Sequence, residues 1–158
     1  MAERHKILIV DDLESNRMIM VEIFQEYYQI LEASDTDRAL QLLEKYHEEI
    51  AAVLLDWYFL GEDGSKVLAA MKEKNWLDHI PVLIVTAEHS AELEKRCIQM
   101  GAHDLIRKPF DLDVMKNRVN NSISLYQHKN QMEQKVYEQG KILMKQLSVM
   151  KMQARKLK

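Results

Sequence analysis

The chain has 158 residues, of which 47% are apolar and 30% charged, so it can bury the core of one ordinary domain. These values exclude a large multidomain enzyme and a chain that is disordered throughout. No apolar run approaches the ~18 residues of a membrane span, and the first residues do not resemble a secretory signal. Cys97 is the only cysteine, so we expect no intrachain disulfide and a reducing, cytoplasmic environment.

The net charge of −3 hides an uneven distribution along the chain. Residues 125–158 carry eight Lys and Arg against two Glu, whereas the residues before them carry 14 Lys and Arg against 23 Asp and Glu. The change in charge and composition predicts two units. We expect a folded domain over residues 1–125 and a basic helical tail over residues 126–158.

Five short apolar runs predict β-strands. Residues 7–10, 53–55 and 82–85 are apolar without alternation, which is typical of parallel strands covered on both faces. Residues 30–33 and 104–107 form two weaker runs.

Between these runs, apolar side chains recur three and four residues apart, which predicts helices with one buried face. Cys97 falls on one of these stripes, so we interpret it as core packing, and Gly101 is placed to end that helix. Alternating strands and helices predict an α/β fold with a doubly wound parallel sheet and right-handed crossovers. The expected buried stripes are Ile19, Ile23, Phe24 and Tyr27; Ala39, Leu42, Leu43 and Tyr46; Val67, Leu68 and Met71; and Leu93, Cys97 and Met100.

Polar side chains stand where four of the predicted strands end, and such a sheet collects functional residues beyond these ends. They are Asp11 and Asp12, Asp56, Thr86 and Lys108. Three neighbouring carboxylates repel one another, and an oxygen cluster with open positions suits Mg²⁺. Lys108 adds a fixed positive charge to this cluster. One carboxylate can then attack a phosphoryl group as a nucleophile, and Thr86 can donate a hydrogen bond to a phosphoryl oxygen.

Each of these residues also has an ordinary structural explanation. Asp12 could cap a helix that begins near Glu14, and a single threonine or lysine is not informative by itself. The joint pattern favours the functional interpretation, because each polar group follows a separate strand.

Other functions would need different residues at these positions. A flavin carrier would need an uncharged phosphate loop after the first strand, and an aspartate phosphatase would need an acid at the position of Tyr58. The main alternative is an interaction module that is not phosphorylated.

With this pattern, residues 6 to about 125 resemble the CheY-like receiver domain of bacterial response regulators, the phosphorylatable part of two-component signalling. The resemblance implies a five-stranded sheet in the order 2-1-3-4-5 with five helices, and a switch controlled by a phosphorelay. Its phosphodonor would be a sensor histidine kinase or a phosphotransfer protein. The matching positions are the acid pair Asp11 and Asp12, the phosphoacceptor Asp56, the switch threonine Thr86, the lysine Lys108 and the turn Asp63-Gly64.

The resemblance also implies a magnesium site and a particular backbone geometry. Asp12, Asp56 and the backbone carbonyl of Tyr58 would bind Mg²⁺, and Asp11 would help through a water molecule. The bond between Lys108 and Pro109 would be cis.

Three positions depart from the family pattern. Phe59-Leu60 replaces the usual Met-Pro, and Leu105 stands where the family usually has an aromatic switch residue. Leu105 can still change its burial, but it has no phenol hydroxyl. Tyr58 is bulky enough to shield an acyl phosphate at Asp56 from water, so we expect slow loss of the phosphoryl group.

The last helix is predicted to begin after Asp111, which can cap it, and to run to Lys156. A heptad pattern in its second half predicts a coiled coil, which would form a homodimer, although an unpaired or frayed helix is the alternative. The expected core stripe is Leu112, Met115, Val119, Ile123 and Tyr126. The expected coiled-coil seam is Val136, Leu143, Met150 and Leu157, with Met132, Gln139, Gln146 and Gln153 at the second position.

The tail also resembles the connectors that join receivers to HD-type phosphohydrolase or diguanylate cyclase output domains, so we expect the chain to be a fragment of a longer protein. Its charges are interleaved with glutamines and apolar residues, so we do not expect direct nucleic-acid binding. We expect no membrane partner.

Overall fold

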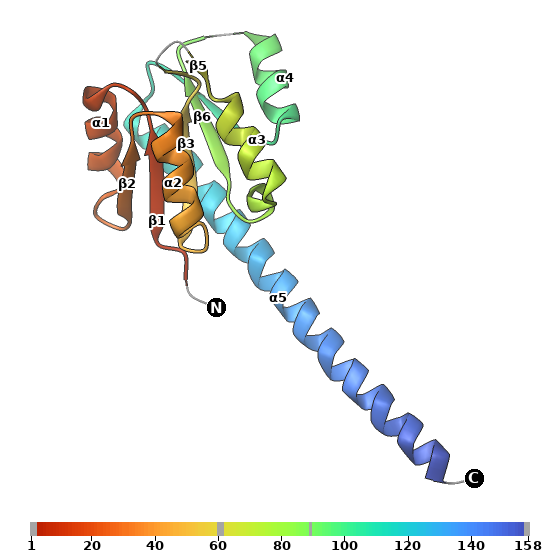
Figure 1. The fold of residues 1–158 in the computed structure, drawn as a ribbon. Helices are drawn as coiled ribbons and strands as arrows, with labels where there is room; N and C mark the ends of the chain where they lie inside the picture. The colour runs from red at the N-terminus through yellow and green to blue at the C-terminus, as the bar shows by residue number, and fades with distance from the viewer. Residues whose placement is uncertain (1–2, 60–61, 89, 157–158) are drawn as a thin grey trace. The chain divides into compact units, whose positions relative to one another are not determined.

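Figure 1 shows a computed structural model of the chain, in which residues 3–59, 62–88 and 90–156 are described. Five parallel strands form one sheet in the order β2-β1-β3-β6-β7. Counted along the chain, this is the predicted order 2-1-3-4-5, and the prediction of fold class is confirmed. The strands are β1 (Lys6–Val10), β2 (Gln29–Ala33), β3 (Ile50–Asp56), β6 (Val82–Thr86) and β7 (Asp104–Arg107).

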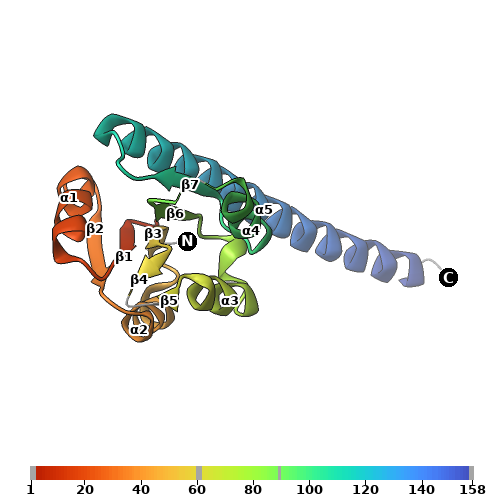
Figure 2. The same ribbon diagram turned by 90° about the horizontal axis from the view of Figure 1, so that it is seen from above.

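Helices cover both faces of this sheet (Figure 2). α1 and the first part of α5 lie on one face, and α2, α3 and α4 lie on the other. The helices are α1 (Glu14–Phe24), α2 (Thr36–Tyr46), α3 (Ser65–Glu73), α4 (Ala91–Gln99) and α5 (Leu112–Lys156), with a short 3₁₀ helix η1 (Trp76–Asp78).

From Ile7 in β1 and from Ala52 in β3, successive residues enter different cores, because side chains of a strand alternate between its two faces. Leu8 and Val53 pack with α2, α3 and α4, whereas Ile7 and Leu54 pack with α1 and α5. All four side chains are fully buried. This double burial explains why the central strands are continuous apolar runs.

A small antiparallel ladder follows the third strand of the main sheet and was not predicted. It joins β4 (Tyr58–Phe59) to β5 (Glu62–Asp63), with Tyr58 opposite Asp63. The predicted Asp63-Gly64 turn therefore divides between the end of β5 and the residue that precedes α3. Leu60, part of the Phe59-Leu60 departure, lies outside the described residues.

The predicted buried face of α1 is partly wrong. Met20 and Phe24 are its buried residues, whereas Ile19 is 44% exposed and Tyr27 is 68% exposed. Apolar residues occupy four successive positions from Met18 onward, so spacing alone could not select the face that meets the sheet. Tyr27 also lies beyond the last residue of the helix.

The beginning of α5 confirms one prediction and corrects another. Asp111 accepts hydrogen bonds from the backbone N–H groups of Asp113 (2.8 Å) and Val114 (3.1 Å), so it caps this helix as predicted. Leu112, predicted to face the core, is 54% exposed because it is the first helical residue. The next members of the stripe, Met115, Val119 and Ile123, are buried.

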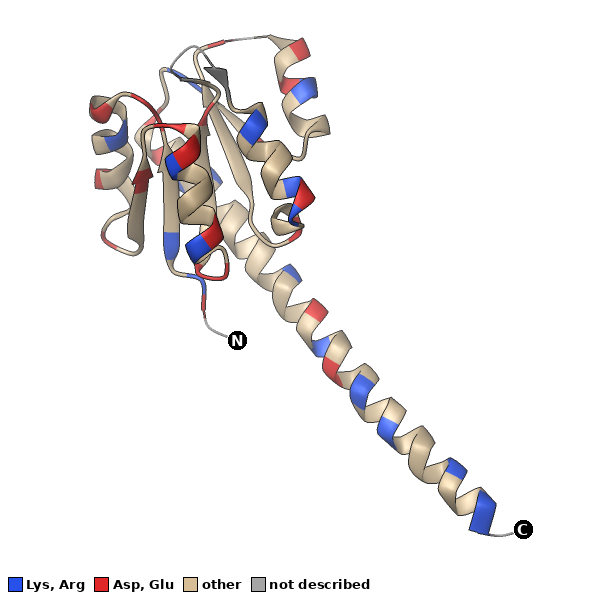
Figure 3. Ribbon diagram, in the orientation of Figure 1, with Lys and Arg blue, Asp and Glu red and all other residues tan. Residues whose placement is uncertain are grey.

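The contacts within the chain divide it into two units, residues 1–126 and 127–158. In the second unit, residues 131–156 are helical and exposed, except that Gly140 is intermediate. Figure 3 shows Lys and Arg recurring along this part of α5. Leu157, a member of the predicted seam, lies outside the described residues. Within the described ranges, no helix is both long enough and apolar enough to cross a membrane.

Candidate functional site

Three carboxylates meet at the carboxyl edge of the sheet. Asp11, Asp12 and Asp56 each place an oxygen within 4.8 Å of the others. Asp11 is fully buried and Asp56 is only 7% exposed. They come together because β1 and β3 are neighbouring parallel strands, whose carboxyl ends share one edge.

Asp11 is fixed at this edge by the loop that leads into α1. Its backbone N–H donates to the carbonyl of Ala33 at 3.1 Å, and its Oδ1 accepts from the N–H of Leu13 at 3.0 Å. Leu13 occupies the capping position of α1 and makes no side-chain capping bond. Leu13, and not Asp12, therefore occupies the capping position, and Asp12 belongs to the carboxylate cluster.

Lys108 brings a positive charge to two of the acids. Its Nζ lies 3.5 Å from Asp11 Oδ2 and 3.5 Å from Asp56 Oδ1. Its backbone N–H donates to the carbonyl of Thr86 at 2.7 Å, which ties the end of β7 to the end of β6. The peptide bond between Lys108 and Pro109 is cis.

Lys108 does not fully compensate the clustered negative charge. Burial, the charge of Asp11 and the charge of Asp12 raise the pKa of Asp56 to about 6, against the opposing attraction of Lys108. Burial has the largest effect, because a buried carboxylate loses the water that stabilises its charged form. The site therefore favours any further cation that can approach Asp56.

The donor atoms of this cluster fit Mg²⁺, which prefers carboxylate oxygens and keeps several waters. Asp11 Oδ2 is buried and accepts no hydrogen bond from the described residues, although Lys108 is near it. A buried carboxylate oxygen in this state is normally satisfied by water or by an ion. Asp12 is less buried than its two neighbours and leaves the cluster open to solvent on that side.

The two predicted switch residues are both buried, one at the end of β6 and the other within β7. Thr86 is 1% exposed, and its Oγ1 accepts a hydrogen bond from the N–H of Glu88 at 3.1 Å. Leu105 is 6% exposed and packs in the core cluster that includes α4. The carbonyl of Leu105 accepts a hydrogen bond from Arg118 of α5 at 3.0 Å.

Charged pairs connect β7 to the helices on either side of it. Arg107 lies 3.4 Å from Glu94 of α4, and Arg118 of α5 lies 3.6 Å from Asp104. These pairs are at least one-third exposed, so each adds little stability. They nevertheless place α4, β7 and α5 in direct polar contact.

Two residues near the site were not predicted from the sequence. Arg17 donates from Nη1 to the carbonyl of Asp11 at 2.7 Å and from Nε to Glu32 at 3.1 Å.

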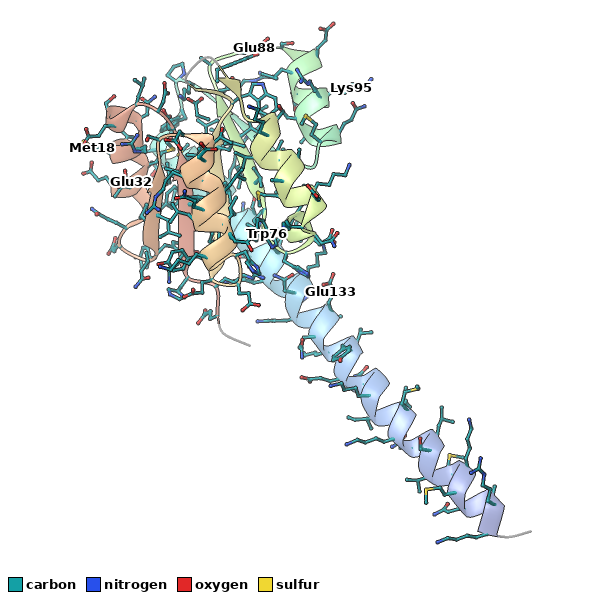
Figure 4. All side chains as sticks on the ribbon, viewed as in Figure 1. Met18, Glu32, Trp76, Glu88, Lys95 and Glu133 are labelled. Atoms are coloured by element: carbon teal, nitrogen blue, oxygen red, sulfur yellow. The ribbon has the colours of Figure 1, made fainter. Side chains whose placement is uncertain are left out.

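The second residue is Glu88, which accepts a hydrogen bond from the hydroxyl of Tyr58 at 2.7 Å. Figure 4 shows Glu88 at the strand ends, near the start of α4, and Glu32 beside α1. Glu88 follows Thr86 by two residues, as Tyr58 follows Asp56, and this equal spacing was the available signal.

Comparison with known proteins agrees with this geometry. Residues 7–120 match the family model described as the response regulator receiver domain. A probable cyclic di-GMP phosphodiesterase of Vibrio cholerae is 34% identical over 113 residues, which cover 72% of this chain and 25% of that protein. Sporulation initiation phosphotransferase F of Bacillus subtilis is 34% identical over 121 residues, covering 76% of this chain and 94% of that protein.

A solved structure shows the same fold. The crystal structure of the signal receiver domain of a putative LuxO repressor protein from Vibrio parahaemolyticus superimposes with a TM-score of 0.75 and 24% identity. The match covers 82% of this chain and 98% of that one. The present chain corresponds to about a quarter of the length of the Vibrio cholerae relative and to nearly all of the Bacillus subtilis relative. It belongs to the family of response regulator receiver domains of two-component signalling.

Proposed function

We propose that this receiver domain is a phosphorylation-dependent switch in which Asp56 accepts a phosphoryl group from a histidine kinase or phosphotransfer protein. The observation that carries the proposal is the position of Lys108, 3.5 Å from both Asp11 and Asp56 at one edge of the sheet. A buried carboxylate beside a fixed ammonium and two further acids is suited to phosphoryl transfer, which depends on positioning and electrostatics.

In the proposed reaction, a carboxylate oxygen of Asp56 attacks the phosphorus of a phosphohistidine in line with the nitrogen that leaves. The new bond joins phosphorus to Asp56, and the electron pair of the broken bond returns to the histidine nitrogen. Lys108 stabilises negative charge on the phosphoryl oxygens, and Thr86 donates a hydrogen bond to one of them.

Asp11, Asp12, Asp56 and the backbone carbonyl of Tyr58 would hold Mg²⁺, with Asp11 acting through water. When bound, the ion supplies positive charge to the phosphoryl oxygens. The support is the carboxylate cluster and the buried Asp11 Oδ2, which accepts no hydrogen bond from the described residues. The role of the Tyr58 carbonyl rests on the resemblance to the family.

The signal would pass from Thr86 and Leu105 to α4 and α5. Drawing Thr86 toward a phosphoryl oxygen displaces the end of β6, to which Lys108 is bonded through its backbone. Leu105 is buried against α4, and its carbonyl is bonded to Arg118 of α5. A shift of β7 would therefore reach both helices, and a change of a few kcal/mol is enough to favour one of two arrangements.

We propose further that residues 1–125 form the receiver and residues 126–158 form a coiled-coil connector that makes a homodimer. The exposed apolar residues Val136, Leu143 and Met150 recur every seven residues. Leu147, which is 52% exposed, lies on the same face. This face is therefore more apolar than the predicted seam, whose second position is mostly glutamine. Burial of such a stripe against a second copy would offset the repulsion between two basic helices.

The output of the switch would be an activity on cyclic di-GMP, carried by another part of a longer cytoplasmic protein. The support is the resemblance to the Vibrio cholerae relative, a probable cyclic di-GMP phosphodiesterase about four times as long as the matched region. Output domains of HD type or of diguanylate cyclase type both fit this proposal.

Intact-mass measurement after incubation with acetyl phosphate and Mg²⁺ tests the proposed phosphoacceptor. We expect the mass of one phosphoryl group on the parent and none on Asp56→Asn, with Asp37→Asn, an exposed acid of α2, behaving as the parent. An equal gain in mass by the parent and by Asp56→Asn would show that the phosphoryl group is attached to a residue other than Asp56. No gain by the parent would favour the interaction module.

A further inference from the structure

The apolar face of the connector has a definite order of large and small residues. Its members are alternately four and three residues apart, which is the spacing of the two core positions of a coiled coil. In chain order the face consists of Val136, Gly140, Leu143, Leu147, Met150 and Ala154. All of them are exposed except Gly140, which is intermediate.

Gly140 opens a hollow in this face. Val136 and Leu143 line the hollow on either side of it, and nothing lies within 4 Å of a Cβ added at Gly140. A side chain of a second helix can enter such a space as a knob enters a hole. The hollow therefore favours a pairing that brings a large residue opposite Gly140.

The two possible orientations of a pair place different residues opposite this hollow. In a parallel pair in register, each core residue meets its own copy, so Gly140 would face Gly140 and Ala154 would face Ala154. Both layers would leave empty volume in the interface, which costs stability.

An antiparallel pair centred on position 145 matches small residues with larger ones. Gly140 then faces Met150 of the second copy, Val136 faces Ala154, and Leu143 faces Leu147. Every layer of this pair is apolar, and large and small residues alternate across it, which is how a core is filled without voids.

The charges of the connector favour the same orientation. Residues 131–144 carry two Lys and two Glu, whereas residues 145–158 carry five Lys and Arg and no acid. Figure 3 shows acidic residues only in the first part of the connector. A parallel pair would align two halves of charge +5 at about one Debye length, ~10 Å in 0.1 M salt. An antiparallel pair aligns each basic half with a neutral half.

We propose that two copies of the connector pair in antiparallel orientation, with the hollow at Gly140 of each copy receiving Met150 of the other. The inference rests on the proposed homodimer and specifies its orientation. Ala154 of one copy then lies beside Val136 of the second copy, which follows the receiver unit by only ten residues. An output domain that follows one connector would therefore begin near the receiver of the second copy.

Disulfide trapping between separately prepared variants tests the orientation. Gly140→Cys and Met150→Cys are mixed under reducing conditions, oxidised with glutathione and separated on a non-reducing gel. We expect a covalent dimer in the mixture and essentially none in either variant alone. The two copies of position 150 would lie about 15 Å apart along the antiparallel pair, beyond the ~7 Å between Cα atoms that a disulfide can span. A parallel pair gives the opposite result, with each variant cross-linking alone.

A second pair of variants and two controls accompany this test. Val136→Cys mixed with Ala154→Cys repeats it away from Gly140, so the result does not depend on how a cysteine fits the hollow. The parent, whose only cysteine is the buried Cys97, should form no covalent dimer. Met152→Cys mixed with Gly140→Cys should form none either, because Met152 lies on the opposite face of the helix.

The outcomes separate this inference from the homodimer on which it rests. Cross-linking of each single variant alone, at least as strong as in the mixture, would overturn the antiparallel orientation and leave the homodimer standing. A dimeric parent in which neither mixed pair cross-links would also overturn this pairing. A monomeric parent in sedimentation equilibrium would overturn the proposed homodimer and this inference with it.

Discussion

Lys108 Nζ and Asp56 Oδ1 lie 3.5 Å apart, yet the pKa of Asp56 is raised to about 6. The attraction of this lysine is smaller than the combined effect of burial and the charges of Asp11 and Asp12. Charged Asp56 is consequently a source of instability in the metal-free protein. A divalent cation at the cluster would remove that instability, which links cation binding to the protonation of one carboxyl group.

Binding of Mg²⁺ should weaken as the pH falls through about 6. Below this value Asp56 takes up a proton, and the proton competes with the cation. We expect the affinity at pH 5 to be roughly ten times lower than at pH 8, measured by isothermal titration calorimetry. Asp37→Asn, outside the cluster, should show the parent profile. Equal affinities at the two pH values would contradict the assignment of Asp56 as a ligand.

Asp56→Asn should stabilise the protein at pH 8 in the absence of divalent cations. The pKa of Asp56 is about 6 in the folded state against 3.8 for the ordinary group, so the folded state binds more protons in this interval. The resulting stability is fully present below 3.8 and is lost as the pH rises through 6. After allowance for solvent screening, we expect a gain of about 1–2 kcal/mol at pH 8 in urea unfolding.

The gain from Asp56→Asn should shrink as the pH falls below 6, because the parent carboxyl is then protonated. Saturating Mg²⁺ should also reverse the order of stability, since it binds only the parent at full strength. A variant less stable than the parent at pH 8 without cations would show that Asp56 is not destabilising in its charged form.

The location of the site could be predicted from the sequence because parallel strands bring their carboxyl ends to one edge. Asp11, Asp12 and Asp56 follow apolar runs so closely that the two strand assignments also located the carboxylate cluster. The face of α1 could not be predicted, because apolar residues from Met18 to Val21 surround the helix. The bond between Tyr58 and Glu88 joins two loops, where no periodic pattern indicates which side chains meet.

Gly101→Ala should destabilise the receiver. Gly101 has φ +110°, a conformation that L side chains rarely adopt, and an added Cβ would lie 2.5 Å from Leu77 Cδ1. We expect a loss of about 2 kcal/mol in the free energy of unfolding, measured in urea. Gly140→Ala is the matched control, since nothing lies within 4 Å of its added Cβ. It should not destabilise the receiver, and equal losses in the two variants would contradict the explanation.

Leu143→Glu should abolish the proposed dimer. Leu143 is 59% exposed and lies on the face shared by Val136, Leu147 and Met150, so a charge there would be buried against the second copy. Met152→Glu is the control, because Met152 is also 59% exposed but lies about two and a half turns further along, on the opposite face. Sedimentation equilibrium measures the outcome. A monomeric parent, or dimers lost equally in both variants, would refute pairing through this face.

Dependence of phosphorylation on a shared divalent ion is the most direct test of the account as a whole. The measurement is the phosphorylated fraction, by intact mass, after acetyl phosphate treatment with Mg²⁺, with EDTA, and with Mg²⁺ in Asp12→Asn. We predict phosphorylation of the parent with Mg²⁺, essentially none with EDTA, and a strongly reduced fraction in Asp12→Asn, which removes one carboxylate from the cluster. Equal phosphorylation of the parent in Mg²⁺ and in EDTA would contradict the account.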